Sequence, residues 1–94
     1  PQAGHEQAGH RPALVLSPSS YNEAAGLALV CPITNTVRGY PFEVSVRDAE
    51  EVTGVILSDH VKSLDWRQRG AAHIETLPEA ITREALAKVQ SLLR

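Results

Sequence analysis

The stretch LALVCPI, residues 27–33, is an almost unbroken apolar run. An apolar run of this length, bounded by turn residues, is typical of a buried strand. The stretch ALVLS, residues 13–17, has the same character, and residues 18–20 and 22–26 between the two runs are rich in turn formers. The sequence therefore predicts two buried strands joined by a turn.

Further strands are predicted on the C-terminal side of this pair. Apolar and polar side chains alternate over residues 42–46, directly after Gly39-Tyr40-Pro41, which is the pattern of a half-exposed strand. A fourth strand is expected over about residues 54–58 and a fifth over about residues 71–75.

The period of the apolar residues changes near the C-terminus. Residues 82–93 contain no glycine or proline, and Thr82 is a suitable N-cap. One amphipathic helix is predicted here, with an apolar face formed by Ala85, Leu86, Val89, Leu92 and Leu93. Short, regularly spaced strands followed by one helix predict a mainly β fold, a strongly curved antiparallel sheet or small barrel capped by a C-terminal helix.

Length and charge limit the kind of protein. A chain of 94 residues with 43% hydrophobic content predicts one small domain, which would gain buried surface from a partner subunit. The formal net charge is −2, so the chain has no global basic field of the kind that attracts nucleic acid. Any site for a polyanion must therefore be local.

The single cysteine and the absence of long apolar segments indicate a cytoplasmic protein. Cys31 cannot form an internal disulfide, and its apolar surroundings predict a buried thiol. No apolar stretch in the sequence reaches membrane-spanning length or has the form of a signal peptide. The chain begins at Pro1, without an initiator methionine, so we expect an upstream segment that is not in this sequence.

Three segments carry more polar groups than the predicted sheet needs: GHEQAGHRP (4–12), TNTVR (34–38) and SDHVKSLDWRQR (58–69). Each has a simple structural explanation. An exposed pair of Arg11 with Glu6 would contribute only about 0–1 kcal/mol, and a lone tryptophan is more often part of a core than a stacking platform. His5 and His10 are five residues apart with no evident third ligand, so no metal site or other cofactor is predicted.

Taken together, the segments indicate a local basic groove. The basic residues Arg11, Arg38, Lys62, Arg67 and Arg69 fall in or beside loops, away from most of the acids. Cations contact a nucleic-acid backbone and an aromatic ring such as Trp66 can stack on bases. The sequence therefore predicts a site for single-stranded nucleic acid, with these RNA-binding candidates: His10, Asn35, Arg38, His60, Lys62, Trp66, Arg67 and Arg69.

Three blocks, PQAGHEQAGHRPALVLSPSSYN, CPITNTVRGYPFEV and GVILSDHVKSLDWRQRGA, resemble the MazF/PemK family of toxin endoribonucleases. The resemblance spans essentially the whole chain. It implies a small SH3-like antiparallel barrel of the MazF/CcdB type with a C-terminal helix. It also implies a homodimer that cuts single-stranded mRNA without a metal and is neutralised by a cognate antitoxin. Family members carry one further strand before the position of Pro1, so the resemblance implies a single toxin domain over residues 1–94 that lacks its first strand.

The resemblance also implies roles for individual residues. The family's arginine in the Arg-Pro pair corresponds to Arg11, its catalytic threonine to Thr34 and its loop glutamate to Glu6. In the PemK-like branch a loop histidine corresponds to His5 and an acidic residue to Asp59. That branch's catalytic arginine corresponds to Leu57 here, which favours a MazF-like assignment on Arg11 and Thr34.

Metal-independent RNA cleavage needs a general base, a cation at the phosphate and a general acid. Arg11 and Thr34 are expected to stabilise the charged phosphate, while His5, Glu6 and Asp59 remain alternatives for the proton transfers. Two other functions stay open on the sequence alone. The chain could be a toxin-fold binding module directed at DNA gyrase, or a non-catalytic relative that binds only the antitoxin.

Overall fold

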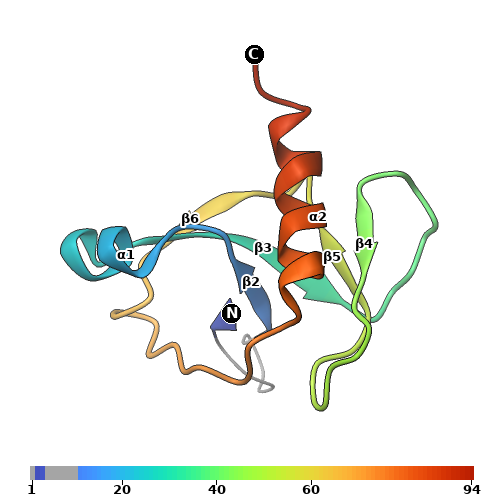
Figure 1. Cartoon of the computed structure of the whole chain (residues 1–94). Helices are drawn as coiled ribbons and strands as arrows, with labels where there is room; N and C mark the ends of the chain where they lie inside the picture. The colour runs from blue at the N-terminus through green and yellow to red at the C-terminus, as the bar shows by residue number, and fades with distance from the viewer. Residues whose placement is uncertain (1, 4–10) are drawn as a thin grey trace.

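The fold is described from a computed structural model of the chain, which describes residues 2–3 and 11–94. The elements follow one another in the order β1 (Gln2–Ala3), β2 (Ala13–Val15), α1 (Ser19–Ala25), β3 (Ala28–Thr34), β4 (Glu43–Ser45), β5 (Val55–Leu57), β6 (Lys62–Leu64) and α2 (Glu79–Gln90). The helix α2 lies against one side of the sheet (Figure 1).

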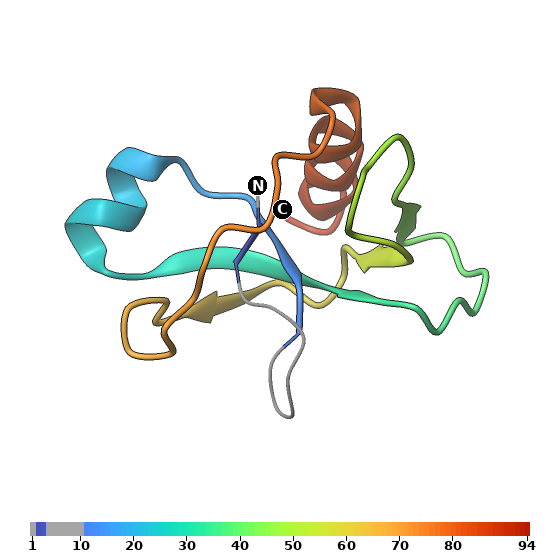
Figure 2. The same cartoon turned by 90° about the horizontal axis from the view of Figure 1, so that it is seen from below.

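Strand β3 organises the sheet because it is the longest strand and forms antiparallel ladders along both of its edges. One edge pairs with β2, where Leu14 is opposite Cys31. The other edge pairs with β6 in its first half, with Ala28 opposite Leu64, and with β5 at its end, with Thr34 opposite Val55. Loops far apart in the sequence therefore meet at the two ends of β3 (Figure 2).

The predicted antiparallel sheet with a C-terminal helix is confirmed, although the sheet is not closed. Its path is β1-β2-β3-β5-β4, with β6 as a branch on β3. Within residues 2–3 and 11–94, no ladder joins β1 to β4. Four predicted strands are present as β2, β3, β4 and β5, and all of them except β3 are shorter than expected.

The core lies between the sheet and α2. Leu14, Ile33 and Ile56 of the sheet are almost completely buried against a cluster that includes Ile81 and Ala85 of the helix. The four-residue spacing of the buried helical positions explains why the periodicity predicted this helix. The helix begins earlier than predicted, at Glu79 after Pro78, so Thr82 is inside the first turn and is not the N-cap.

Cys31 is fully buried, as predicted. Burial, together with the negative charge of Asp59, raises the pKa of its thiol to about 11. The thiol is therefore protonated at neutral pH and is not a nucleophile.

Two elements differ from the predictions because they carry no periodic apolar pattern. Residues 19–25 form α1, not only a turn; none of its residues is buried, and it ends at Gly26 with a positive φ of 72°. Residues 62–64 form β6 inside a segment interpreted as a binding site, and two of its three side chains are exposed. Pairing with β3 holds this strand in place.

The predicted fifth strand, over residues 71–75, is wrong. This segment contains only a single bridge residue, His73, and is otherwise irregular. It is held by Glu75, whose carboxylate accepts backbone N–H bonds from Glu50 (3.1 Å), Glu51 (2.9 Å) and Val52 (2.6 Å). These bonds tie the segment to the loop between β4 and β5. The Glu75 side chain therefore holds residues 71–75 in place, as pairing in the predicted strand would have done.

The Glu75 clamp predicts a pH-dependent stability. The three N–H bonds lower the pKa of Glu75 below the 4.5 of an unperturbed glutamate, so its stabilisation is present above pH 4.5 and is lost as the pH falls through the lowered pKa. Glu75→Gln should therefore lower Tm at pH 7, and the difference from wild type should shrink only as the pH falls below 4.5. Thermal melts by circular dichroism between pH 7 and pH 3 would measure this. A difference that is constant with pH, or equal to that of the control Glu50→Gln, would contradict the prediction.

Candidate functional site

A cavity of about 500 Å³ lies at the C-terminal end of β3. Its lining combines two predicted catalytic residues, Arg11 and Thr34, with Arg38 and His60, which were predicted to bind RNA. Arg11 precedes β2, Arg38 follows β3 and His60 follows β5, so three separate segments contribute. The fold therefore brings together basic side chains from each of the three polar segments of the sequence.

Thr34 is the last residue of β3, and its hydroxyl has a defined orientation. Its Oγ1 accepts the backbone N–H of Thr36 at 3.1 Å. With a lone pair engaged in this way, the hydroxyl hydrogen can be donated to a ligand in the cavity. Thr34 is only half-buried, so a ligand can reach it.

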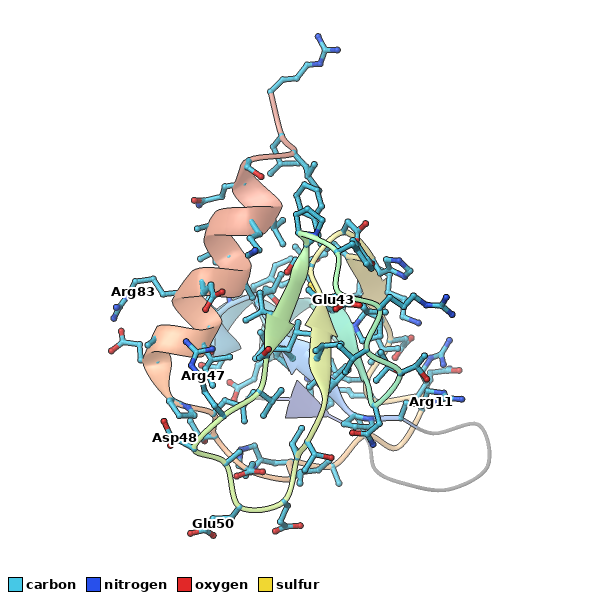
Figure 3. All side chains as sticks on the ribbon, turned by 90° about the vertical axis from the view of Figure 1, so that its right-hand side faces the viewer. Arg11, Glu43, Arg47, Asp48, Glu50 and Arg83 are labelled. Carbon is cyan, nitrogen blue, oxygen red and sulfur yellow. The ribbon has the colours of Figure 1, made fainter. Side chains whose placement is uncertain are left out.

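The loop that carries Arg38 is anchored by Glu43, which the sequence did not single out. The carboxylate of Glu43 accepts the backbone N–H groups of Arg38 and Gly39, both at 2.9 Å. Figure 3 shows Glu43 and Arg11 on the side of the molecule that carries this site. The anchor fixes the course of the loop beside Thr34.

Asp59 does not line the cavity but contacts two residues that do. Its Oδ1 accepts the hydroxyl of Tyr40 at 3.0 Å and lies 3.7 Å from Nε2 of His60. The pKa of Tyr40 is raised, mainly by desolvation and secondly by this hydrogen bond. Its hydroxyl therefore stays protonated and donates to Asp59. Asp59 can therefore orient both Tyr40 and His60.

The remaining predicted RNA-binding residues of the third segment are not at this cavity. Trp66 is half-buried, and its Nε1 donates to the carbonyl of Asn22 at 3.0 Å. Arg67 donates to the carbonyl of Glu23 at 2.7 Å and stacks on Trp66, 4.8 Å from the ring centroid. These contacts join the loop after β6 to α1, at the opposite end of β3 (Figure 2). Arg69 follows in the same loop, while Lys62 lies on β6 opposite Val30.

Three predicted site residues, His5, Glu6 and His10, lie outside the described residues. Asn35 lies beside Thr34 and accepts a hydrogen bond from the hydroxyl of Thr53 at 2.8 Å. Over residues 2–3 and 11–94, no group of three or more potential ligands among His, Cys, Asp and Glu gathers as a metal site. The same part of the chain has no helix that is long and apolar enough to cross a membrane.

Besides Glu43, two residues that position the site, Tyr40 and Gly54, were missed by sequence reasoning. Tyr40 was interpreted only as part of a loop end. Gly54 has a φ of 108°, and its Cα faces the backbone of Thr34 so closely that a Cβ would lie 2.2 Å from the Thr34 carbonyl oxygen. A glycine at the start of an apolar strand is a weak signal for such a contact.

The cavity is suited to a phosphate group. Arginine side chains can bind phosphate oxygens in a bidentate manner, and a threonine hydroxyl can donate to a third oxygen. The antiparallel sheet and the C-terminal helix are the elements that the resemblance to the toxins of toxin–antitoxin systems implied.

The chain belongs to the family described as PemK-like, MazF-like toxin of type II toxin-antitoxin system, which it matches over residues 1–93. It is 47% identical over 93 residues to endoribonuclease toxin MazF of Escherichia coli K12, covering 99% of this chain and 83% of that protein. It is 36% identical over 97 residues to Escherichia coli endoribonuclease PemK, covering 99% and 73% of the two chains.

A solved structure of MazE-MazF from Deinococcus radiodurans (Form-II) has the same fold. Its TM-score is 0.91 at 44% identity, covering 98% of this chain and 89% of that chain. A structure of MazF alone from the same organism (Form-I) has a TM-score of 0.86 at 52% identity, covering 99% and 84%.

Proposed function

We propose that this chain is an endoribonuclease toxin that cleaves single-stranded mRNA at a short sequence in the cytoplasm. The observation that carries the proposal is the convergence of Arg11 and the oriented hydroxyl of Thr34 on one cavity. The relatives named above as endoribonucleases support the same reaction.

In the proposed reaction the 2′-hydroxyl of a ribose attacks the adjacent phosphorus. A bond forms between the 2′-oxygen and phosphorus, the bond from phosphorus to the 5′-oxygen breaks, and a proton moves to that leaving oxygen. Arg11 and Thr34 stabilise the negative charge that grows on the non-bridging oxygens. The products are a 2′,3′-cyclic phosphate and a 5′-hydroxyl.

The proton transfers are assigned to groups around this phosphate. His5 and Glu6 are the candidates for the general base that takes the 2′-hydroxyl proton. Protonated His60, which lines the cavity with Asp59 3.7 Å away, could supply the proton to the leaving oxygen. Asp59 would then act through His60 and Tyr40, not by touching the phosphate.

Cleavage should persist when divalent metal ions are removed, because the charge at the phosphate comes from guanidinium groups. Wild-type protein incubated with single-stranded RNA in EDTA should cleave at the same sites and nearly the same rate as without EDTA. Thr34→Ala is the control for contaminating nuclease. Loss of cleavage in EDTA with recovery on adding a divalent ion would contradict the proposal and return His5 and His10 to consideration as ligands.

We expect a cognate antitoxin to neutralise the protein by binding to the basic side chains of the first cavity. Arg11, Arg38 and His60 would attract an acidic peptide as they attract RNA. The solved structure with a TM-score of 0.91 is described as MazE-MazF, so that relative was solved with a second protein. RNA and antitoxin would then compete for the same cations.

We also propose a homodimer, formed through an apolar face that one chain leaves exposed. A hollow of about 800 Å³ lies between α2 and β3. Large hydrophobic side chains around it are exposed: Tyr21, Leu29, Val61, Leu86, Leu92 and Leu93. A surface of this kind on a small domain is typical of a subunit interface.

Light scattering at micromolar concentration should give twice the 10.2 kDa mass of one chain. Leu86→Glu places a charge on the apolar face and should shift the mass towards a single chain, whereas Arg83→Ala on the outer side of the same helix should not. A wild-type mass equal to one chain would disprove the homodimer.

A further inference from the structure

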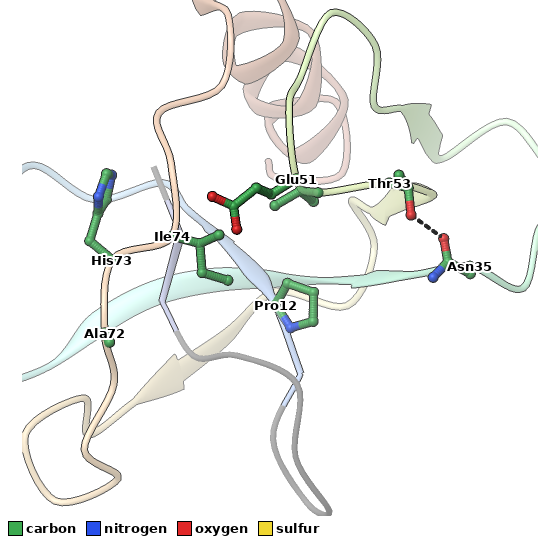
Figure 4. A pocket seen from close by; sticks show the side chains of 8 residues that line it. Pro12, Asn35, Glu51, Thr53, Ala72, His73 and Ile74 are labelled. Atoms are coloured by element: carbon green, nitrogen blue, oxygen red, sulfur yellow. Dashed lines mark hydrogen bonds between the residues drawn. The ribbon is translucent and has the colours of Figure 1, made fainter.

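A second cavity, of about 530 Å³, lies between the loop that joins β4 to β5 and the irregular segment before α2. Glu51 and Thr53 line it from the loop, and His73 and Ile74 line it from the segment (Figure 4). Among the described residues, none of those predicted to be catalytic, Arg11, Thr34 and Asp59, lines it.

Two residues that line the second cavity are the direct sequence neighbours of residues that line the first. Pro12 and Asn35 line the second cavity, and these residues directly follow Arg11 and Thr34. Consecutive Cα atoms are about 3.8 Å apart, so the second cavity begins one residue away from the two groups that hold the phosphate in the proposed reaction.

The lining offers apolar surface with one fixed hydrogen-bonding amide. Pro12 and Ile74 provide apolar surface for the faces of a ring. Asn35 Oδ1 accepts the Thr53 hydroxyl at 2.8 Å, which fixes the amide orientation, and Nδ2 forms no hydrogen bond with the described residues. The amide N–H groups are thus available to a ligand carbonyl.

The charge of the lining favours a base over a phosphate. Glu51 directs its carboxylate towards the segment that carries Ile74 (Figure 4). The same loop exposes Asp48 and Glu50 (Figure 3). These acids repel phosphate groups and acidic peptides, whereas an ionised carboxylate accepts hydrogen bonds from an exocyclic amino group of a base.

The cavity is preformed because its walls are tied together. Glu75 joins the segment to the loop through three backbone N–H bonds of 2.6–3.1 Å, and the Thr53–Asn35 bond joins the loop to the end of β3. A ligand would not have to organise these segments, which reduces the cost of binding.

We infer that the second cavity binds one nucleobase of the RNA, next to the cleaved phosphate, and that Glu51 makes it select a base with an exocyclic amino group over uracil. This inference rests on the proposed endoribonuclease function. It assigns sequence preference at one position to Glu51, with Asn35 as the donor to a base carbonyl.

The test uses the whole protein and a randomised single-stranded RNA library, with cut sites read by sequencing. Wild type should disfavour uracil by about tenfold at one position beside the cut. Glu51→Gln, which keeps the size of the side chain and removes the charge, should relax the preference at that position only. Glu50→Gln is the matched control, because Glu50 is an acid of the same loop that does not line the cavity.

Two synthetic RNAs that carry either cytosine or uracil at that position, and are otherwise identical, would then be compared by kcat/KM. The effect of the base change should depend on whether Glu51 is present. The base change should cost about tenfold with wild type and little with Glu51→Gln.

Active Glu51→Gln with an unchanged preference would overturn the inference while leaving the proposed function standing. The inference would also be wrong if Glu51→Gln weakened antitoxin binding and left base preference intact, since the cavity would then be a protein-binding surface. Absence of cleavage by wild type would overturn the proposed function itself and the inference with it.

Discussion

Arg11→Ala should lower the rate of RNA cleavage by roughly two or more orders of magnitude, the range for loss of one preorganised group that stabilises a charged transition state. The guanidinium of Arg11 lines the cavity beside Thr34. Arg11 is exposed and lies outside the hydrophobic core, so the variant should keep the fold of the wild type. Single-turnover cleavage and circular dichroism together would measure the effect.

Arg83→Ala is the matched control for Arg11→Ala. Arg83 is an exposed arginine on α2 whose ion pair is with Glu79, one helical turn away at 3.3 Å, and it projects from another side of the molecule (Figure 3). Its loss should leave cleavage unchanged. Thr34→Ala should lower cleavage by a similar factor to Arg11→Ala, and near-normal cleavage by either folded variant would show that the assignment of these residues is wrong.

Gly54→Ala should destabilise the protein by about 3 kcal/mol or more, because the backbone there is both strained for an alanine and in close contact. The φ of 108° is one that side chains with a Cβ rarely adopt. The added Cβ would lie 2.2 Å from the carbonyl oxygen of Thr34 and 2.8 Å from Oδ1 of Asn35. Any relief of this contact must move the end of β3, so the remaining folded protein should also lose activity.

Gly70→Ala provides the comparison for Gly54→Ala. Gly70 has a φ of 64°, but a Cβ there would meet nothing within 4 Å. Only the cost of the left-handed backbone applies, about 1 kcal/mol. Urea unfolding followed by circular dichroism would separate the two variants. Equal stabilities would mean that Gly54 does not press on Thr34 as described.

The sheet and the terminal helix could be predicted because burial leaves a periodic pattern in the sequence. The apolar run of residues 27–33 becomes β3, and the helical spacing of Ala85 and Val89 becomes the buried face of α2. By contrast, α1 buries no residue, and the segment around Glu75 is held by one carboxylate on three N–H groups. Such contacts join residues more than 20 positions apart and leave no local pattern.

The site could be predicted in part for the same reason. Residue type and resemblance identified Arg11, Thr34, Arg38 and His60, and the fold places all four at one cavity. Composition alone also grouped Trp66 with them, but its indole N–H is already used by the Asn22 carbonyl at the other end of β3. Which loops meet in space depends on the order of the strands in the sheet, and local sequence patterns do not show that order.

Attack by the 2′-hydroxyl on a phosphate held by Arg11 and Thr34 is tested most directly with an RNA that carries a single 2′-deoxynucleotide at the cut site. The protein would be incubated in EDTA with this RNA and with the all-ribose RNA, and the ends would be identified by mass spectrometry. The proposed mechanism predicts a 2′,3′-cyclic phosphate and a 5′-hydroxyl from the all-ribose RNA and no cut at the deoxy position. A 5′-phosphate end, or cleavage at the deoxy position, would contradict it.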